Sequence, residues 1–149
     1  MKQLICFLFL INTYTVAKAQ SAKDSITTAV NNLFIAMKMA DTVLLKKCFS
    51  PNALMQTIKT GNDNLKVLDE TVADFIGFVG KETPGAADEQ IVIESIKIVG
   101  PMAAVWAPYK FYYKGIFSHC GVNSFQLVRL AEGWKIQYII DTRRKQGCE

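Results

Sequence analysis

The chain has 149 residues, half of them hydrophobic, and a formal net charge of +4. Its 17 basic and 13 acidic residues are scattered, apart from a basic run, Arg143 to Lys145, near the end. A nucleic-acid-binding surface needs clustered basic side chains, so no nucleic-acid partner is predicted. The length allows one domain with a hydrophobic core of its own and leaves no room for a second.

The N-terminus has the composition of a secretory signal peptide. Lys2 precedes the apolar stretch Leu4–Ile11, and Ala17–Ala19 matches the small-x-small site that signal peptidase cleaves. The stretch is much shorter than the roughly 20 residues that a membrane-spanning helix needs. We therefore expect residues 1–19 to be a signal peptide and residues 20–149 to be the mature domain. The protein would be secreted or periplasmic, with no membrane attachment after cleavage.

Two helices are expected at the start of the mature domain. Between Ser21 and Ala40, hydrophobic residues recur at three- and four-residue spacing, which predicts an amphipathic helix. Asp41 is a suitable N-cap for a short second helix, and the segment Ser50–Asn52 ends it because proline disfavours helical geometry in the preceding residue.

A short strand and a third helix are expected next. Residues Ala53–Lys59 are predicted to form the strand, and Thr60–Asn64 a turn or flexible loop. Either Asp69 or Thr71 could then cap a helix that stops near Gly80.

Beyond this point the sequence changes to β-branched and aromatic residues separated by turn signals. After a predicted polar loop over Lys81–Glu89, four strands are expected over Gln90–Val99, Met102–Tyr113, Ile116–Leu130 and Trp134–Thr142. Consecutive strands joined by tight turns predict an antiparallel meander. Together with a helical first half, they indicate an α+β fold with the helices on one face of the sheet.

This order of elements resembles the nuclear transport factor 2-like superfamily, which has a cystatin-like fold. The segments Ala104–Tyr112, His119–Gly121, Phe125–Val128 and Gly133–Ile136 are similar to its SnoaL-like, lumazine-binding branch. The resemblance covers the mature domain and implies a cone-shaped, strongly curved antiparallel sheet with the N-terminal helices packed on its concave face. It implies a pocket inside the cone, but carries over neither a ligand nor a complete catalytic set.

His119 is the one histidine of the chain and the first candidate for chemistry. If its ring enters the cone, it can act as a general base or bind a ligand; otherwise it is a strand-end histidine bonded to a neighbouring strand. Cys120 is adjacent on the same strand and points to the other face, which argues against a Cys–His pair. With no second histidine and no cysteines at zinc spacing, neither a metal nor a cofactor is predicted.

Asp141 is the second candidate because it follows two isoleucines in an otherwise apolar strand. A two-residue turn formed by Glu132 and Gly133 would place Ser124 opposite Asp141, whereas a three-residue loop would place Asn123 there. Asp141 is therefore either a carboxylate inside the cone or a strand-end residue paired with a surface cation such as Arg143.

Three functions are compatible with these features. The first is a domain that binds a small apolar or aromatic ligand without covalent chemistry. The second is a proton-transfer enzyme, isomerase-like or dehydratase-like, acting on a small cyclic substrate with Asp141 or His119 as catalytic base and a tyrosine as oxyanion donor. The third is an association module, with a homodimer formed by the convex face of the sheet. The predicted ligand pocket consists of Trp106, Tyr112, His119, Asn123 and Asp141.

Three cysteines remain after the predicted cleavage: Cys48, Cys120 and Cys148. At most one intramolecular disulfide can form among them, so at least one thiol is free, buried or intermolecular.

Overall fold

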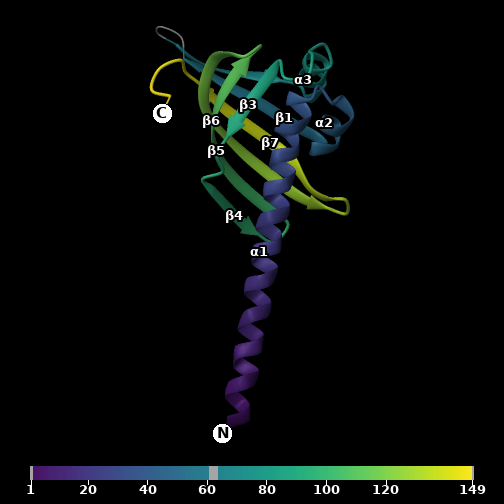
Figure 1. Ribbon diagram of the computed structural model, residues 1–149, viewed down its shortest axis with the longest axis vertical. Helices are drawn as coiled ribbons and strands as arrows, with labels where there is room; N and C mark the ends of the chain where they lie inside the picture. Colours follow the sequence, from purple (N-terminus) through teal and green to yellow (C-terminus); the bar gives the residue numbers. More distant parts are fainter. Residues whose placement is uncertain (1, 61–63, 149) are drawn as a thin grey trace.

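The computed structural model describes the backbone of residues 2–60 and 64–148, and the side chains of residues 20–59 and 64–148. Within these ranges it has the predicted α+β fold, with helices packed against one large curved sheet (Figure 1). The helices are α1 (Lys2–Lys38), α2 (Thr42–Cys48) and α3 (Val72–Val79). The strands are β1 (Phe49–Thr60), β2 (Leu65–Glu70), β3 (Ala87–Ile91), β4 (Ser95–Val99), β5 (Met102–Tyr113), β6 (Ile116–Leu130) and β7 (Gly133–Arg143).

The strands lie in the order β2-β1-β7-β6-β5-β3, and β4 pairs with β5 beyond the end of β3. The strands of the predicted meander pair antiparallel, and so do β1 and β2. The sheet as a whole is mixed, because β1 runs parallel to β7. It remains unclosed, with β2 at one edge and β3 and β4 along the other.

The strand predicted over Gln90–Val99 is divided in two. Both halves, β3 and β4, pair with β5, and the break between them lies beside Pro108. Proline has no N–H to donate to a ladder; its carbonyl accepts a hydrogen bond from the Val92 N–H. The predicted polar loop was wrong at its end, because β3 begins at Ala87 and includes Glu89.

Helix capping follows the sequence closely. The Asp41 side chain accepts hydrogen bonds from the N–H groups of Val43 and Leu44, at 3.0 and 2.9 Å, and so begins α2. Thr71, rather than Asp69, begins α3, and its hydroxyl accepts from the Asp74 N–H at 3.0 Å. Asp69 lies in β2, a strand that the sequence did not predict because five of its six residues are exposed.

The hydrophobic core fills the space between the helices and the inner face of the sheet. Helix α1 buries its apolar stripe there, and the Phe34 ring meets the Phe125 ring edge-on at a centroid distance of 6.1 Å. The predicted signal peptide, residues 1–19, lies outside the part of the chain whose side chains are described. No helix in the described part is both long and apolar enough to cross a membrane.

Gly121 allows the end of β7 to come unusually close to β6. A Cβ atom at this position would lie 1.7 Å from the Thr142 carbonyl oxygen and 2.9 Å from Cε1 of Tyr109. Both neighbours belong to packed strands and have little room to move. The absence of a side chain at Gly121 is therefore a condition for the arrangement of strand ends at this corner of the sheet.

We predict that Gly121→Ala lowers the free energy of unfolding by about 2–4 kcal/mol, because the added methyl group must displace backbone. Gly77→Ala is the matched control. Gly77 lies in α3, and no atom lies within 4 Å of the place that an added methyl group would take, so the same change should stabilise the helix by about 0.5–1 kcal/mol. Denaturant unfolding measures both, and similar small effects would contradict the close-approach argument.

Candidate functional site

Alternation along β5 divides its aromatic residues between the two faces of the sheet. Tyr109, Phe111 and Tyr113 face inward and line cavities. Trp106 and Tyr112 face outward: Trp106 is 48% exposed, and the Tyr112 ring packs edge-on against Phe117. The structure therefore does not bring Trp106 and Tyr112 to the cavity in which we predicted them.

The other three predicted site residues do meet inside the cone. His119 and Asp141 line a main cavity of about 270 Å³. Asn123 and Asp141 line a smaller floor pocket of about 80 Å³ that shares Glu70 and Glu89 with the main cavity. The main cavity can hold a small organic molecule rather than a single water.

The cavity opens into a wider depression, which we call the mouth. The mouth has a volume of about 650 Å³ and shares Phe78, Phe111, His119 and Arg143 with the main cavity. It lies at the end of the sheet where β1 and β7 end and β6 begins, on the side of the domain opposite to the N-terminal end of α1 (Figure 1). Floor, main cavity and mouth thus form one continuous path into the cone.

Glu89 is the most perturbed acid at the floor. Asn123 donates a hydrogen bond from Nδ2 to Oε1 of Glu89 at 2.7 Å. Burial raises the pKa of the Glu89 carboxyl from its ordinary 4.5 to about 7, the Asn123 hydrogen bond opposes this rise, and the negative charge of Asp141 adds to it. Glu89 can therefore exchange a proton with a ligand near neutral pH.

Asp141 is held by two donors. The Tyr109 hydroxyl lies 2.9 Å from Oδ2 of Asp141 and 3.0 Å from the Thr142 carbonyl oxygen, and Arg143 Nε donates to the same Oδ2 at 2.9 Å. Burial raises the pKa of Tyr109, and the Asp141 and Glu89 charges raise it further, so the hydroxyl remains protonated. Both interpretations of Asp141 hold at once, since it faces the cavity and also pairs with Arg143.

His119 forms part of the wall between main cavity and mouth. Its ring lies edge-on to Tyr109 and tilted on Phe111, with centroid distances of 5.7 and 5.1 Å. The Ser118 hydroxyl lies 3.0 Å from Nδ1. Burial lowers the pKa of His119, and the Arg143 charge lowers it further against the opposing effect of Asp141. The imidazole is therefore neutral at physiological pH and offers a flat surface.

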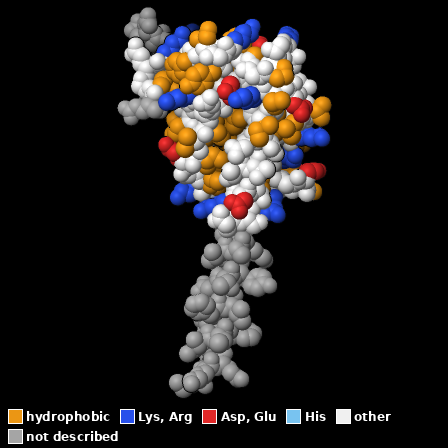
Figure 2. All heavy atoms as spheres, viewed as in Figure 1, with side chains coloured by type: hydrophobic (Ala, Val, Ile, Leu, Met, Phe, Trp, Pro, Cys, Tyr) orange, Lys and Arg blue, Asp and Glu red, His pale blue; other side chains and the backbone are white. Residues whose placement is uncertain are grey.

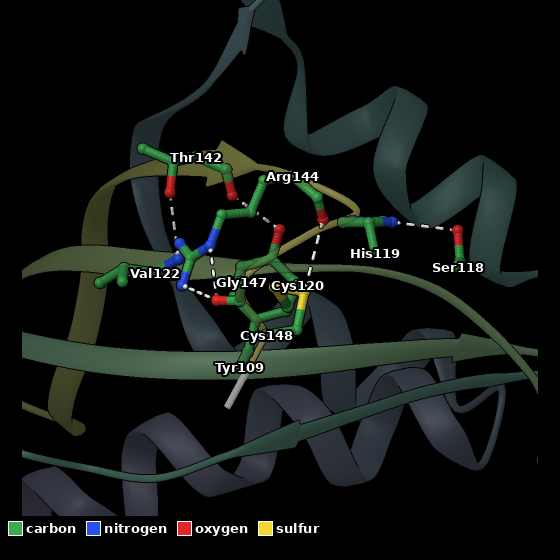
Figure 3. The surroundings of a disulfide bond; sticks show 9 residues. All are labelled: Tyr109, Ser118, His119, Cys120, Val122, Thr142, Arg144, Gly147 and Cys148. Carbon is green, nitrogen blue, oxygen red and sulfur yellow. Dashed lines mark hydrogen bonds between the residues drawn. A yellow bond between two sulfur atoms is a disulfide. The ribbon is translucent and has the colours of Figure 1, made fainter.

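A disulfide fastens the C-terminal segment beside the mouth. Cys120 is bonded to Cys148, and the backbones of Cys120 and Arg144 exchange two hydrogen bonds of 2.9 Å (Figure 3). The Arg144 guanidinium donates to the Gly147 carbonyl from Nε and Nη2, both at 3.2 Å. Cys48 is the buried free thiol. One intramolecular disulfide and one unpaired thiol agree with the cysteine count.

Sequence reasoning missed several residues of this site. Glu89 was assigned to a loop, although Ala87, Glu89 and Ile91 lie on one face of β3 and are less exposed than Gln90. This alternation of exposure marks a strand with one acid on its inner face. Glu70 was missed together with β2. Burial raises the pKa of its carboxyl, a rise that Arg143 opposes. Among the residues with described side chains, no group of three or more His, Cys, Asp and Glu is arranged to hold a metal ion.

The fold has many relatives among solved structures. An NTF2-like protein with a cystatin-like fold from Novosphingobium aromaticivorans is 11% identical, with a TM-score of 0.72 over 93% of this chain and 92% of that one. An NTF2-like protein of unknown function from Silicibacter pomeroyi is 17% identical, with a TM-score of 0.66 over 87% and 98%. A "putative dehydratase" of the NTF2-like family from Streptomyces avermitilis is 14% identical, with a TM-score of 0.64 over 85% and 98%.

The chain has the NTF2-like fold. At these identities the structural likeness establishes the fold alone. No protein-family model matches the sequence, and no curated protein matches it. The SnoaL-like, lumazine-binding branch stays a prediction.

The pKa of Glu89 yields a prediction about stability and pH. A carboxyl with a raised pKa in the folded state stabilises the fold below its ordinary pKa of 4.5 and loses this contribution as the pH rises through about 7. The wild-type protein should therefore lose stability relative to Glu89→Gln between these pH values. His119 and Glu70 titrate in both proteins, so the difference between the two curves isolates Glu89.

Urea unfolding at a series of pH values measures this difference. Glu94→Gln, at an exposed position between β3 and β4, serves as control and should follow the wild-type curve. A constant difference between wild type and Glu89→Gln would show that Glu89 has an ordinary pKa.

Proposed function

We propose that this chain is an exported domain that binds a small organic molecule in the cavity of its cone. The observation that carries the proposal is the group of polar side chains Glu89, His119 and Asp141 around a cavity of about 270 Å³, with Asn123 at the adjoining floor pocket. Burying carboxyl groups costs free energy that apolar residues of similar size would not cost. Hydrogen bonds from these groups to a ligand would offset this cost, which accounts for polar residues at these positions.

The cavity walls indicate the shape of the ligand. Phe75, Phe78 and Phe111 supply apolar area, and His119 adds a flat, neutral ring. The carboxyl groups of Glu89 and Asp141 lie at the inner end of the cavity, on the floor, together with Asn123. A small, flat, apolar or aromatic molecule with a polar group at its inner end fits this arrangement.

Export remains part of the proposal and has two supports. One is the signal-like composition of residues 1–19. The other is the Cys120–Cys148 disulfide, because disulfides persist in oxidising compartments and are rare in the cytosol.

Native mass spectrometry of the protein purified from its own host tests the proposal. We expect a chain that starts at Gln20, contains one disulfide and retains a small molecule. The same spectra report subunit number and so test the homodimer, which we propose to form through the outer face of the sheet, where Met102, Trp106 and Phe117 are exposed. A chain free of any small molecule, and to which none can be added, would contradict the proposed function.

Two substitutions separate the cavity from the outer face. His119→Gln removes a wall of the cavity and should weaken binding of the retained molecule by about tenfold, or about 1.4 kcal/mol. Trp106→Gln changes the opposite face and should leave that affinity unchanged. Equal effects of both substitutions would place the ligand elsewhere.

Proton transfer on the bound molecule is the second candidate function. Glu89 favours it, because a carboxyl with a pKa of about 7 in a cavity beside the protonated Tyr109 hydroxyl is suited to general acid–base catalysis. Glu89 is better placed as base than either residue predicted from sequence. Asp141 is engaged by Tyr109 and Arg143, and a lowered pKa makes His119 a weak base.

Deuterium exchange distinguishes an enzyme from a binding domain. If Glu89 transfers protons, the molecule identified by mass spectrometry should incorporate deuterium when incubated with the protein in D₂O, and Glu89→Gln should slow this incorporation by about a hundredfold or more. Incorporation no faster than in buffer alone would leave binding as the function.

A further inference from the structure

The charged side chains described at the mouth of the cavity are all positive. Its lining includes four cationic residues, Lys59, Arg143, Arg144 and Lys145, and no carboxylate among the described residues. They come from separate places in the chain: Lys59 from the end of β1, Arg143 from the end of β7, and the other two from the segment after it. The fold therefore gathers cations that the sequence leaves partly dispersed.

Among the described residues, most of this positive charge is not neutralised by a carboxylate in the mouth. Arg143 forms an ion pair with Asp141 at 2.9 Å. The Arg144 guanidinium donates to the carbonyl of Gly147, which carries no net charge. The charges of Lys145 and Lys59, like that of Arg143, extend to the site and help to lower the pKa of His119. An anion in the mouth would meet several uncompensated cations.

The cations at the C-terminal segment are held in position rather than left on a loose tail. The Cys120–Cys148 disulfide closes the segment onto β6, and the two backbone hydrogen bonds between Cys120 and Arg144 extend the β-ladder (Figure 3). Figure 2 shows basic side chains beside hydrophobic ones at the end of the domain that carries this segment. A fixed charge loses less entropy on binding an anion than a mobile one does.

The floor of the same cavity has the opposite character. Glu70, Glu89 and Asp141 lie there, and the raised pKa values of the two glutamates show that this region disfavours additional negative charge. Between mouth and floor, the walls are formed by flat or apolar side chains, Phe78, Phe111 and His119. An anionic ligand can therefore enter in one orientation only.

We infer that the ligand is a small aromatic or unsaturated organic anion, such as a carboxylate, whose charged group stays in the mouth while its uncharged end reaches Glu89. The inference rests on the proposed function and specifies its ligand class. The cations supply attraction and orientation, the ring surfaces bind the flat body, and the floor excludes the charged end.

Three probes of nearly equal shape test the charge preference: naphthoate, naphthylmethanol and naphthylmethylammonium. Binding to the full mature chain is followed by NMR, with the resonances of His119 and Phe111 as reporters of the cavity. Naphthoate should bind most tightly and lose affinity as the salt concentration rises, because salt screens the mouth cations. Naphthylmethanol should bind more weakly and without salt dependence, and naphthylmethylammonium should bind most weakly because the cations repel it.

A pair of double variants with equal change in net charge supplies the control. Lys59→Gln with Lys145→Gln should weaken naphthoate about three- to tenfold, equivalent to about 0.7–1.4 kcal/mol, and leave naphthylmethanol unchanged. Lys23→Gln with Lys97→Gln, on α1 and β4, should affect neither probe.

The outcomes separate this inference from the proposed function. If naphthylmethanol binds in the cavity as tightly as naphthoate, or if the mouth variant weakens both probes equally, the preference for an anion is wrong while small-molecule binding stands. If no probe perturbs the cavity resonances at millimolar concentration, the inference fails, and the proposed function fails with it only when native mass spectrometry also finds no bound molecule.

Discussion

The bulge at Gln137 determines which side chains of β7 face the cavity. Before the bulge, Ile136 pairs with Leu127 on the inner face; after it, Ile139 pairs with Phe125 and Asp141 with Asn123. Strict alternation from Ile136 would instead have turned Asp141 outward. The bulge is secured from β1, because the buried Ser50 hydroxyl donates to Oε1 of Gln137 at 2.7 Å. One extra residue thus brings the Asp141 carboxylate inside the cone.

The acidic side chains inside the cone are stable there because favourable partners offset the free-energy cost of burying their charge. Three acids at the floor are tolerated because each has a partner: Asn123 for Glu89, Tyr109 and Arg143 for Asp141, and the more distant Arg143 charge for Glu70. Arg143 lies between floor and mouth and belongs to both. The same side chain therefore limits the repulsion among the acids and lies between the acidic floor and the cationic mouth.

The sequence predicted those parts of the fold that leave a local pattern. The hairpin strands β5 and β6, the cap at Asp41, the cap at Thr71 as one of two candidates, and the apolar stripe of α1 all have such a pattern. The strand β2 does not, because its side chains are mostly exposed and show no alternation of burial. The parallel pairing of β1 with β7 is also hidden, since partners so distant in the chain leave no local trace.

For the site, the sequence identified residue types but not the faces on which they lie. The pairing of Asn123 with Asp141 was one of two registers left open. It arises from the bulge together with a two-residue loop, rather than from a longer loop. Trp106 and Tyr112 were placed in the pocket for their chemistry, and alternation on β5 turns them away. Glu89 was overlooked, because an acid at the end of a polar stretch resembles a surface residue until the strand's partner is known.

The buried thiol of Cys48 has a consequence for how the chain acquires its disulfide. The three cysteines whose side chains are described, Cys48, Cys120 and Cys148, permit three pairings, and the fold forms Cys120–Cys148. Burial raises the pKa of Cys48 to about 11, so once α2 packs against the core this cysteine has almost no thiolate with which to attack another sulfur. The order of events in oxidative folding then decides the pairing. When the core closes before oxidation, the Cys48 thiol cannot act as a nucleophile, and Cys120 pairs with Cys148.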